Sequence, residues 1–200
     1  MASTSTDCLF IDTETAGLPT NTHYPVINAL KHWPRVVQVA WERYTIEGEP
    51  IESESYIVQP EGFDIPEDAT DVHGITTERA LDEGVPLEDV LAMLRQGLES
   101  SGSLIAHNIE FDGKVLDAEY QRRGTKPNPM WHIPYFCTMR SSRSFCGLKD
   151  ANGKRKYPTL TELHQELFGE EFDDAHDARA DVKACARCYF ELRRRGVRVS

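Results

Sequence analysis

Hydrophobic and polar positions recur with two different periods along the 200-residue chain. Runs in which apolar residues are continuous, or occupy every second position, are typical of strands, because successive strand side chains point to opposite faces. Such runs predict five strands, at 8–11, 35–44, 51–60, 103–108 and 134–139. A turn containing Gly48 and Pro50 joins the second run to the third, so these two are expected to form a hairpin.

Elsewhere apolar residues recur every three or four positions, which indicates helices. Helices are expected at 86–99, 109–123, 159–169 and 177–195. The Pro/Gly/Asp-rich stretch 60–76 and the stretch after residue 139 are expected to be loops. This order predicts an α/β fold: a five-stranded mixed sheet, antiparallel in its early part and parallel afterwards, flanked by helices.

The composition is that of an ordinary globular protein, with 40% hydrophobic and 28% charged residues. We therefore expect one domain over residues 1–200, with its core at about 7–195, and see no internal repeat or linker. The first ten residues lack a basic and apolar leader, and no apolar run is long enough to span a membrane. A cytoplasmic protein with no membrane partner is expected.

The five cysteines are scattered, which suits reduced thiols. Cys185 and Cys188 alone have the spacing of a zinc or redox pair. No second pair completes a zinc site, and the surrounding residues predict a helix, so we interpret both as buried helical thiols. A zinc-binding or redox interaction protein is the alternative that this pair leaves open.

The net charge of −11 argues against a nucleic-acid partner. Two features weaken that argument. Acids that are clustered around bound cations contribute less net negative charge than the formal count suggests, because that count omits the cations. The bases are also uneven, because residues 140–156 contain six bases against the single acid Asp150. A solvated loop and a phosphate-binding segment are both consistent with this cluster.

Two acids occupy positions that a solvent-facing acid would avoid. Asp181 lies four residues before Cys185, on the apolar row of the last helix. Asp112 lies three and four residues before Val115 and Leu116, again on an apolar row. A bare buried carboxylate is unfavourable, so each of these acids needs a partner.

A further pair of acids follows the first strand. Asp12 and Glu14 are two residues apart, and in an extended chain they project to the same side. All these acids occur where a strand ends or a helix begins, and such ends gather ligands in α/β sheets. Four converging carboxylates repel each other unless cations lie between them, and oxygen ligands select Mg²⁺ or Mn²⁺.

Two such ions can hold the attacking and leaving oxygens of a phosphodiester in line. The attacking water must also lose a proton, and an imidazole titrates in the appropriate range. His176, five residues before Asp181 and outside the helix, is the natural candidate.

At this point the sequence resembles the DEDDh 3′→5′ exonucleases, which have a ribonuclease-H-like fold. "DTETAGL" (12–18), "HNIEFD" (107–112) and "HDARAD" (176–181) are similar to the three exonuclease motifs, in order and spacing. "PRVVQVAW" (34–41) and "VHGIT" (72–76) are similar to accessory segments. The resemblance spans about residues 7 to 192, and its one departure is Ala16, where Thr is commoner.

The resemblance implies a role for each motif residue. Asp12 would bridge two divalent cations, Mg²⁺ or Mn²⁺. Glu14 and Asp181 would hold the ion that carries the nucleophilic water, and Asp112 would hold the second. His176 would be the general base.

The resemblance also implies contacts with the substrate. Leu18 and Phe111 would pack on bases, and the 3′-hydroxyl would be bound by Glu14 and the nearby backbone. His107 and Asn108 are expected chiefly to shape the second motif, and His73 to be a structural turn residue. The predicted substrate-binding set is Thr13, Glu14, Leu18, His107, Asn108, Phe111, Arg143, Lys154, Arg155 and Lys156, the last four on phosphates.

The expected function is a metal-dependent 3′→5′ exonuclease that releases 5′-mononucleotides from single-stranded nucleic acid, DNA rather than RNA. A module on the same fold that binds nucleic-acid ends without cutting them is the alternative. The family includes proofreading subunits, so a polymerase is a conceivable partner that no feature of this sequence supports. The sequence does not determine the oligomeric state.

Overall fold

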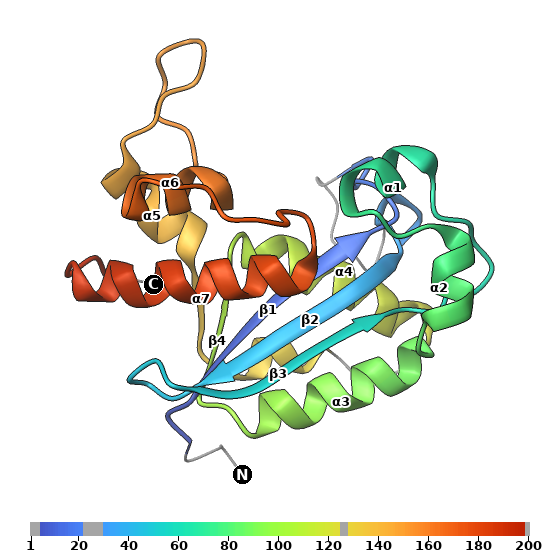
Figure 1. Ribbon diagram of the computed structural model, residues 1–200. Coiled ribbons are helices and arrows are strands. Elements are labelled where there is room, and N and C mark those ends of the chain that lie inside the picture. The colour runs from blue at the N-terminus through green and yellow to red at the C-terminus, as the bar shows by residue number, and fades with distance from the viewer. Residues whose placement is uncertain (1–4, 22–29, 125–127, 199–200) are drawn as a thin grey trace.

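A five-stranded sheet in the order β3-β2-β1-β4-β5 organises the protein. The computed structural model describes residues 5–21, 30–124 and 128–198 (Figure 1). The strands are β1 (Cys8–Thr15), β2 (Val36–Tyr44), β3 (Pro50–Ile57), β4 (Ser103–Ala106) and β5 (Tyr135–Cys137). β1–β2 and β2–β3 pair antiparallel, whereas β1–β4 and β4–β5 pair parallel. The predicted mixed sheet is thus confirmed.

Helices cover both faces of the sheet (Figure 1). They are α1 (Glu67–His73), α2 (Thr77–Glu83), α3 (Leu87–Glu99), α4 (Ile109–Arg122), α5 (Thr138–Cys146), α6 (Leu160–Phe168) and α7 (Ala178–Arg194). Short 3-10 helices occupy Leu30–His32 and Pro129–His132. No helix among the described residues combines the length and apolar character that crossing a bilayer requires.

β1 explains why the sheet is covered on both sides. Leu9 and Ile11 pack into the larger core with α3 and α4, while Cys8 and Phe10 pack against α7. A strand that buries both faces has a continuous apolar run instead of an alternating one, which is why this segment begins CLFI.

Two helices lie where loops were predicted, and a third lies in a stretch for which no element was predicted. α1 falls inside 60–76 and most of α5 falls after residue 139, whereas α2 covers 77–83. α1 and α2 each bury a single alanine, Ala69 and Ala80, which is too little for a helical period to be visible. α5 buries Thr138 and Ser142, so its inner face is polar in sequence.

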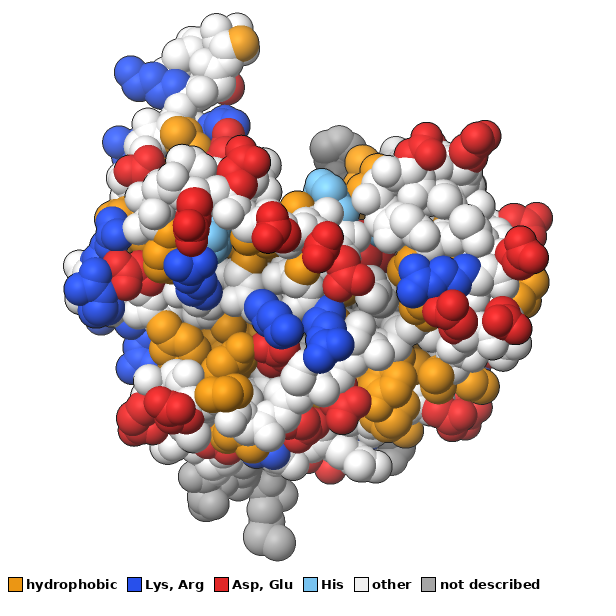
Figure 2. Space-filling model, viewed as in Figure 1, with side chains coloured by type: hydrophobic (Ala, Val, Ile, Leu, Met, Phe, Trp, Pro, Cys, Tyr) orange, Lys and Arg blue, Asp and Glu red, His pale blue; other side chains and the backbone are white. Residues whose placement is uncertain are grey.

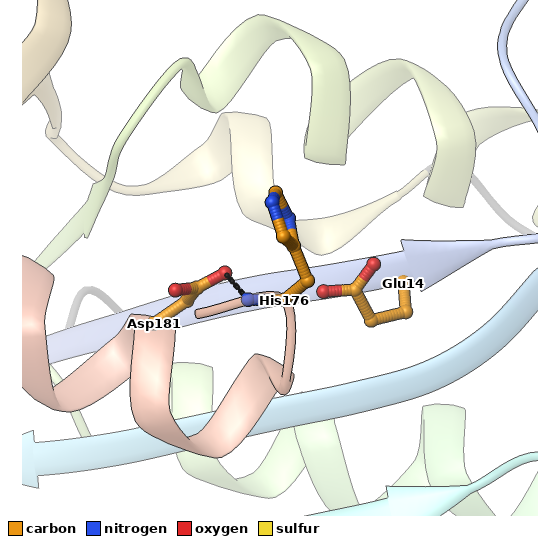
Figure 3. Close-up of side chains that lie close together, drawn as sticks. All are labelled: Glu14, His176 and Asp181. Carbon is orange, nitrogen blue, oxygen red and sulfur yellow. Dashed lines mark hydrogen bonds between the residues drawn. The ribbon is translucent and has the colours of Figure 1, made fainter. Parts of the chain in front are cut away.

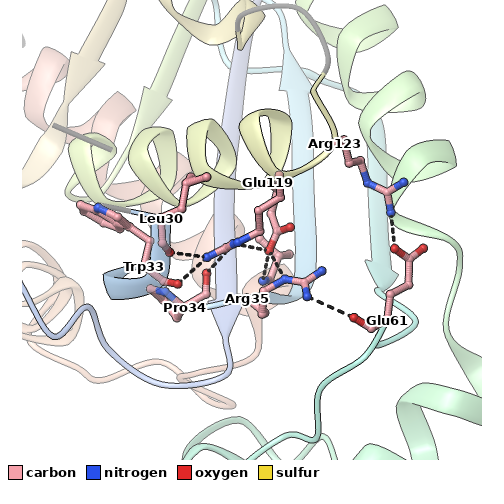
Figure 4. Close-up of polar contacts among 9 residues, drawn as sticks. Leu30, Trp33, Pro34, Arg35, Glu61, Glu119 and Arg123 are labelled. Carbon is pink, nitrogen blue, oxygen red and sulfur yellow. Dashed lines mark hydrogen bonds and ion pairs between the residues drawn. The ribbon is translucent and has the colours of Figure 1, made fainter. Parts of the chain in front are cut away.

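A buried ion-pair network joins α4 to the chain that enters β2 (Figure 4). The Glu119 carboxylate, 1% exposed, accepts from Arg35 at 2.8 Å and from Arg122 at 2.9 Å. It also accepts from the backbone N–H of Val36. Arg122 donates in turn to the carbonyls of Leu30, Trp33 and Pro34. The network therefore fixes the approach to β2, which borders β1.

Removing the charge at the centre of this network should destabilise the fold. Glu119→Gln leaves two half-buried guanidinium groups without their carboxylate, so we expect a loss of about 3–5 kcal/mol in the free energy of unfolding. Urea denaturation measures it. Glu61→Gln is the matched control, because Glu61 pairs with Arg123 at the surface and should cost less than about 1 kcal/mol. Equal losses in the two variants would show that Glu119 has no special structural role.

Candidate active site

β1 supplies two acids from the middle and end of one strand. Asp12 and Glu14 lie opposite Ala40 and Gln38 of β2 and share a strand face, as their spacing predicted. β1 extends to Thr15, so both acids belong to the strand and do not follow it. The sheet therefore holds their backbones rigidly.

α4 brings Asp112 to the same place. The Asp112 side chain is buried, and its Oδ1 accepts a hydrogen bond from the Thr13 hydroxyl at 2.8 Å. Thr13 points to the opposite side of β1 from Asp12 and Glu14, toward the layer that contains α4. Asn108, just before α4, has a left-handed backbone with φ of 72°. This conformation turns the chain sharply from β4 into the helix.

α7 brings the last acid and the imidazole (Figure 3). Asp177 caps α7, accepting from the backbone N–H groups of Arg179 and Ala180. Asp181, one turn further on, accepts from the His176 backbone N–H at 3.3 Å. His176 also has a left-handed backbone, with φ of 74°. Asp177 is thus the N-terminal cap of α7, while Asp181 faces the site.

Gln38 is a site-building residue that the sequence analysis missed. Its side chain, 5% exposed on β2, accepts from the backbone N–H of Ala178 at 3.2 Å and donates to Asp177 at 3.4 Å. It therefore anchors the start of α7 to the sheet, beside β1. A single glutamine inside the apolar run 36–41 was the available signal.

The site brings four largely buried carboxyl groups close together. Burial, and then repulsion from its neighbours, raises the pKa of Glu14 to about 8 and that of Asp12 well above its usual value. Burial raises the pKa of Asp112 to about 7, against the opposing hydrogen bond from Thr13. Burial also raises the pKa of Asp181 to about 6. Such a cluster needs protons or cations to stay together.

The donor set fits hard divalent cations. Ligand atoms of Glu14, His176 and Asp181 lie within 4.8 Å of one another. Within the described ranges this is the one such group of three. Asp12 and Asp112 fall outside it. The charge of Asp112 nevertheless raises the pKa of both Asp12 and Glu14, and the charges of Glu14 and Asp181 raise the pKa of Asp12. Carboxylate oxygens from three separate elements are suitable for Mg²⁺ or Mn²⁺.

A pocket of about 470 Å³ opens beside these acids. β1 lines it with Thr13, Glu14 and Thr15, and Leu18 reaches it from the following loop, with 80% of its surface exposed. The space-filling view shows a hollow with acidic and histidine side chains near it (Figure 2). Phe111 and His176 complete its lining on the sides of α4 and α7.

α1 forms the wall that the sequence analysis left out. Asp68, Ala69, Val72 and His73 line the pocket from this helix. His73 does have a turn role, because its Nδ1 accepts from the backbone N–H of Ile75 at 3.1 Å. The "VHGIT" segment was the signal, although a loop was predicted there.

The remaining predicted residues divide into two groups. His107 stands outside the pocket lining and bonds Thr138 and the Pro158 carbonyl, which agrees with a shaping role. Burial lowers the pKa of His107 to about 4, so the ring is neutral. The second group, on α5 and the following hairpin, does not line the pocket and comprises Arg143, Lys154, Arg155 and Lys156.

Comparison with known proteins agrees with this geometry. The sequence model of RNase_T, described as an exonuclease family, matches residues 9–189. The chain belongs to this exonuclease family. The predicted enzyme class, an exonuclease hydrolase, is confirmed, and divalent-metal dependence follows from membership. A search of curated proteins gives no match.

Solved structures show the same fold in other exonucleases. A crystal structure of E. coli Exonuclease I in complex with a dA16 oligonucleotide superposes with a TM-score of 0.75 at 22% identity, over 96% of this chain. The complex with dT13 gives 0.76 at 21% identity over 94% of the chain. A moderately thermophilic Exonuclease I from Methylocaldum szegediense gives 0.76 at 22% identity over 95% of it. This exonuclease spans 41% of the length of each of these proteins. The predicted ribonuclease-H-like architecture is confirmed.

Cys185 and Cys188 take no part in the acidic site. Both lie buried on α7, as interpreted from the sequence. Burial raises the pKa of the Cys188 thiol to about 12 and that of Cys185 well above its usual value. Both groups therefore stay protonated, which is unfavourable for zinc binding and thiol exchange.

The raised pKa values predict how stability depends on pH. Between about pH 4.5 and pH 8 the unfolded Glu14 carboxyl is ionised while the folded one keeps its proton, and Asp112 and Asp181 behave alike. The unfolded state then binds fewer protons, so metal-free exonuclease should lose stability as pH rises through this window. Thermal unfolding in EDTA measures the decrease.

Mg²⁺ or Mn²⁺ should reverse this loss, because a bound cation replaces the missing protons. At pH 8 we expect the melting temperature to rise by several degrees on adding millimolar cation. Asp12→Asn should be more stable than the unmodified protein in EDTA, yet gain little from the metal. A metal-free protein equally stable at pH 5 and pH 8 would contradict this account of the cluster.

Proposed function

We propose that this protein is a 3′→5′ exonuclease that removes 5′-mononucleotides from the 3′ ends of single-stranded nucleic acid, DNA rather than RNA. One observation carries the proposal: acids from β1, α4 and α7 converge near His176, and two members of this group, Glu14 and His176, line a pocket of about 470 Å³. The match to Exonuclease I complexes with single-stranded dA16 and dT13 supports DNA as the substrate.

The acids would hold two divalent cations, Mg²⁺ or Mn²⁺, through Asp12, Glu14, Asp112 and Asp181. Oxygen-only carboxylate ligands and raised carboxyl pKa values support this assignment. Such cations, when bound, activate the attacking water and stabilise charge on the leaving oxygen. Thr13 keeps Asp112 oriented through its 2.8 Å hydrogen bond.

His176 would serve as the general base. Its ring stands beside the Glu14 and Asp181 carboxylates on an exposed loop (Figure 3). In hydrolysis, water would attack the phosphorus of the last phosphodiester and its proton would pass to His176. The bond from this phosphorus to the 3′ oxygen of the penultimate nucleotide would break, and that oxygen would take a proton from solvent to become the new 3′-hydroxyl. The hydrogen bond from the His176 backbone N–H to Asp181 fixes the position of the backbone from which the imidazole extends.

The pocket would bind the terminal nucleotide. Leu18 and Phe111 provide apolar surface for bases, and Val72 adds to it from α1, with 54% of its surface exposed. Glu14, which lines the pocket, would accept a hydrogen bond from the terminal 3′-hydroxyl. A strand with a blocked 3′ end should therefore be a poor substrate.

Replacing Asp12 and His176 separates metal binding from base catalysis. Asp12→Ala should abolish both hydrolysis of a labelled oligonucleotide and thermal stabilisation by Mn²⁺. His176→Asn should reduce the rate by about 10²–10⁴-fold while it leaves Mn²⁺ stabilisation largely intact. Asn is chosen because it tolerates the left-handed backbone, and His176→Ala shows the added cost of that conformation.

Two results would refute parts of this proposal. A His176→Asn variant with the full rate would exclude His176 as the base. An unmodified protein that binds oligonucleotides but does not cut them with Mn²⁺ present would be the non-cleaving module on the same fold.

A further inference from the structure

A hairpin of residues 147–157, here called the basic hairpin, projects from the protein beyond α5 and α6 (Figure 1). Lys149 and Arg155 pair as an antiparallel bridge. The Asp150 N–H donates to the Lys154 carbonyl at 2.8 Å, and Lys156 N–H donates to Leu148 at 3.0 Å. These bonds make the segment an ordered arm where a loop was expected.

The cations at the tip of this arm lack acidic partners. The only acid of the hairpin, Asp150, uses its Oδ1 to accept from the backbone N–H groups of Asn152 and Lys154. Within the part of the chain that the structure describes, Lys149, Lys154 and Arg155 form no ion pair. Lys156 differs, because it pairs with Glu162. Figure 2 shows blue side chains gathered on this projection.

The base of the hairpin also presents an aromatic ring. Tyr157 is 46% exposed, and the Arg143 guanidinium lies 4.4 Å from the centre of its ring. Exposed aromatic rings beside cations are how proteins stack single-stranded bases without reading their sequence.

The arm is connected to the acidic site. The Pro158 carbonyl, directly after the hairpin, accepts from His107 Nε2 at 3.1 Å, and His107 ends the strand segment that leads into α4. On α5, Arg140 and Arg143 share a face three residues apart. Arg140 pairs with Glu110, which is next to the pocket residue Phe111. Arg140 and Arg143 therefore link Glu110, the neighbour of a pocket residue, to the base of the arm at Tyr157.

We propose that the basic hairpin binds the substrate strand upstream of its 3′ end, with Lys149, Lys154 and Arg155 on phosphates and Tyr157 stacked on a base. The proposal rests on the proposed function, and it adds a second contact region that only longer strands reach. A nucleic acid fits better than a protein, because phosphates and bases match both the unpaired cations and the exposed ring.

The phosphate contacts are tested by a triple substitution, Lys149→Ala/Lys154→Ala/Arg155→Ala. Fluorescence anisotropy in EDTA measures binding of a dT oligonucleotide of about sixteen nucleotides without hydrolysis. Three lost contacts should reduce the slope of log K against log salt by about 2. The control Arg79→Ala/Arg194→Ala/Arg198→Ala removes equal charge elsewhere and should leave the slope nearly unchanged.

The stacking contact is tested at Tyr157. Tyr157→Ala should weaken binding of the oligonucleotide by about tenfold, and Tyr157→Phe should restore it, because the ring alone is needed. An abasic oligonucleotide of equal length should bind the Ala variant and the unmodified protein alike. If Tyr157 is only structural, Tyr157→Ala should weaken binding of both oligonucleotides equally, and that result would overturn the proposed stacking contact.

A small substrate separates this proposal from the proposed function. The p-nitrophenyl ester of thymidine 5′-monophosphate is too short to reach the arm, so the triple variant should hydrolyse it at the unmodified rate. An unmodified protein that leaves this ester and the oligonucleotides intact would refute the hydrolytic function only. If the triple variant keeps the slope of the unmodified protein, the proposed binding of phosphates by the basic hairpin is refuted, whether or not the protein hydrolyses either substrate.

Discussion

Mutual repulsion among four carboxylates is the constraint around which this protein is built. Asp12, Glu14, Asp112 and Asp181 are brought together where burial raises the pKa of each. Such a cluster opposes folding, so the surrounding structure must supply the stability. β1 does so by burying apolar side chains on both faces immediately before its acids.

Positioning depends on neutral groups as much as on charges. The Thr13 hydroxyl and the Gln38 amide fix Asp112 and the start of α7 without adding charge to the site. Asn108 and His176, each just before a helix that carries an acid, hold left-handed backbones that are unfavourable for most residues. Strain of this kind persists only where the surroundings enforce it, and here it occurs in two of the three motifs.

The sequence singles out Asp112 and Asp181 because their periodicity conflicts with their chemistry. Asp112 and Asp181 lie on apolar rows of long helices, where period and burial are easily recognised. α1 was missed because a seven-residue helix that buries only Ala69 has no measurable period. Gln38 was missed for another reason: its function depends on a contact with Ala178, 140 residues away, which no local pattern encodes.

The distribution of charge would allow a protein of net charge −11 to bind the proposed polyanionic substrate. Its acids are gathered where divalent cations would neutralise them, whereas Lys and Arg side chains that form no ion pair with any described residue project on a hairpin that ends beside His107. The imidazole of His107 is neutral, so it donates to the Pro158 carbonyl without adding a charge between the arm and the acidic site. A strand could then be held by the arm through long-range attraction while its 3′ end enters a pocket that attracts phosphate only when metal is bound. Separating the two charges in this way lets binding and hydrolysis be governed by different residues.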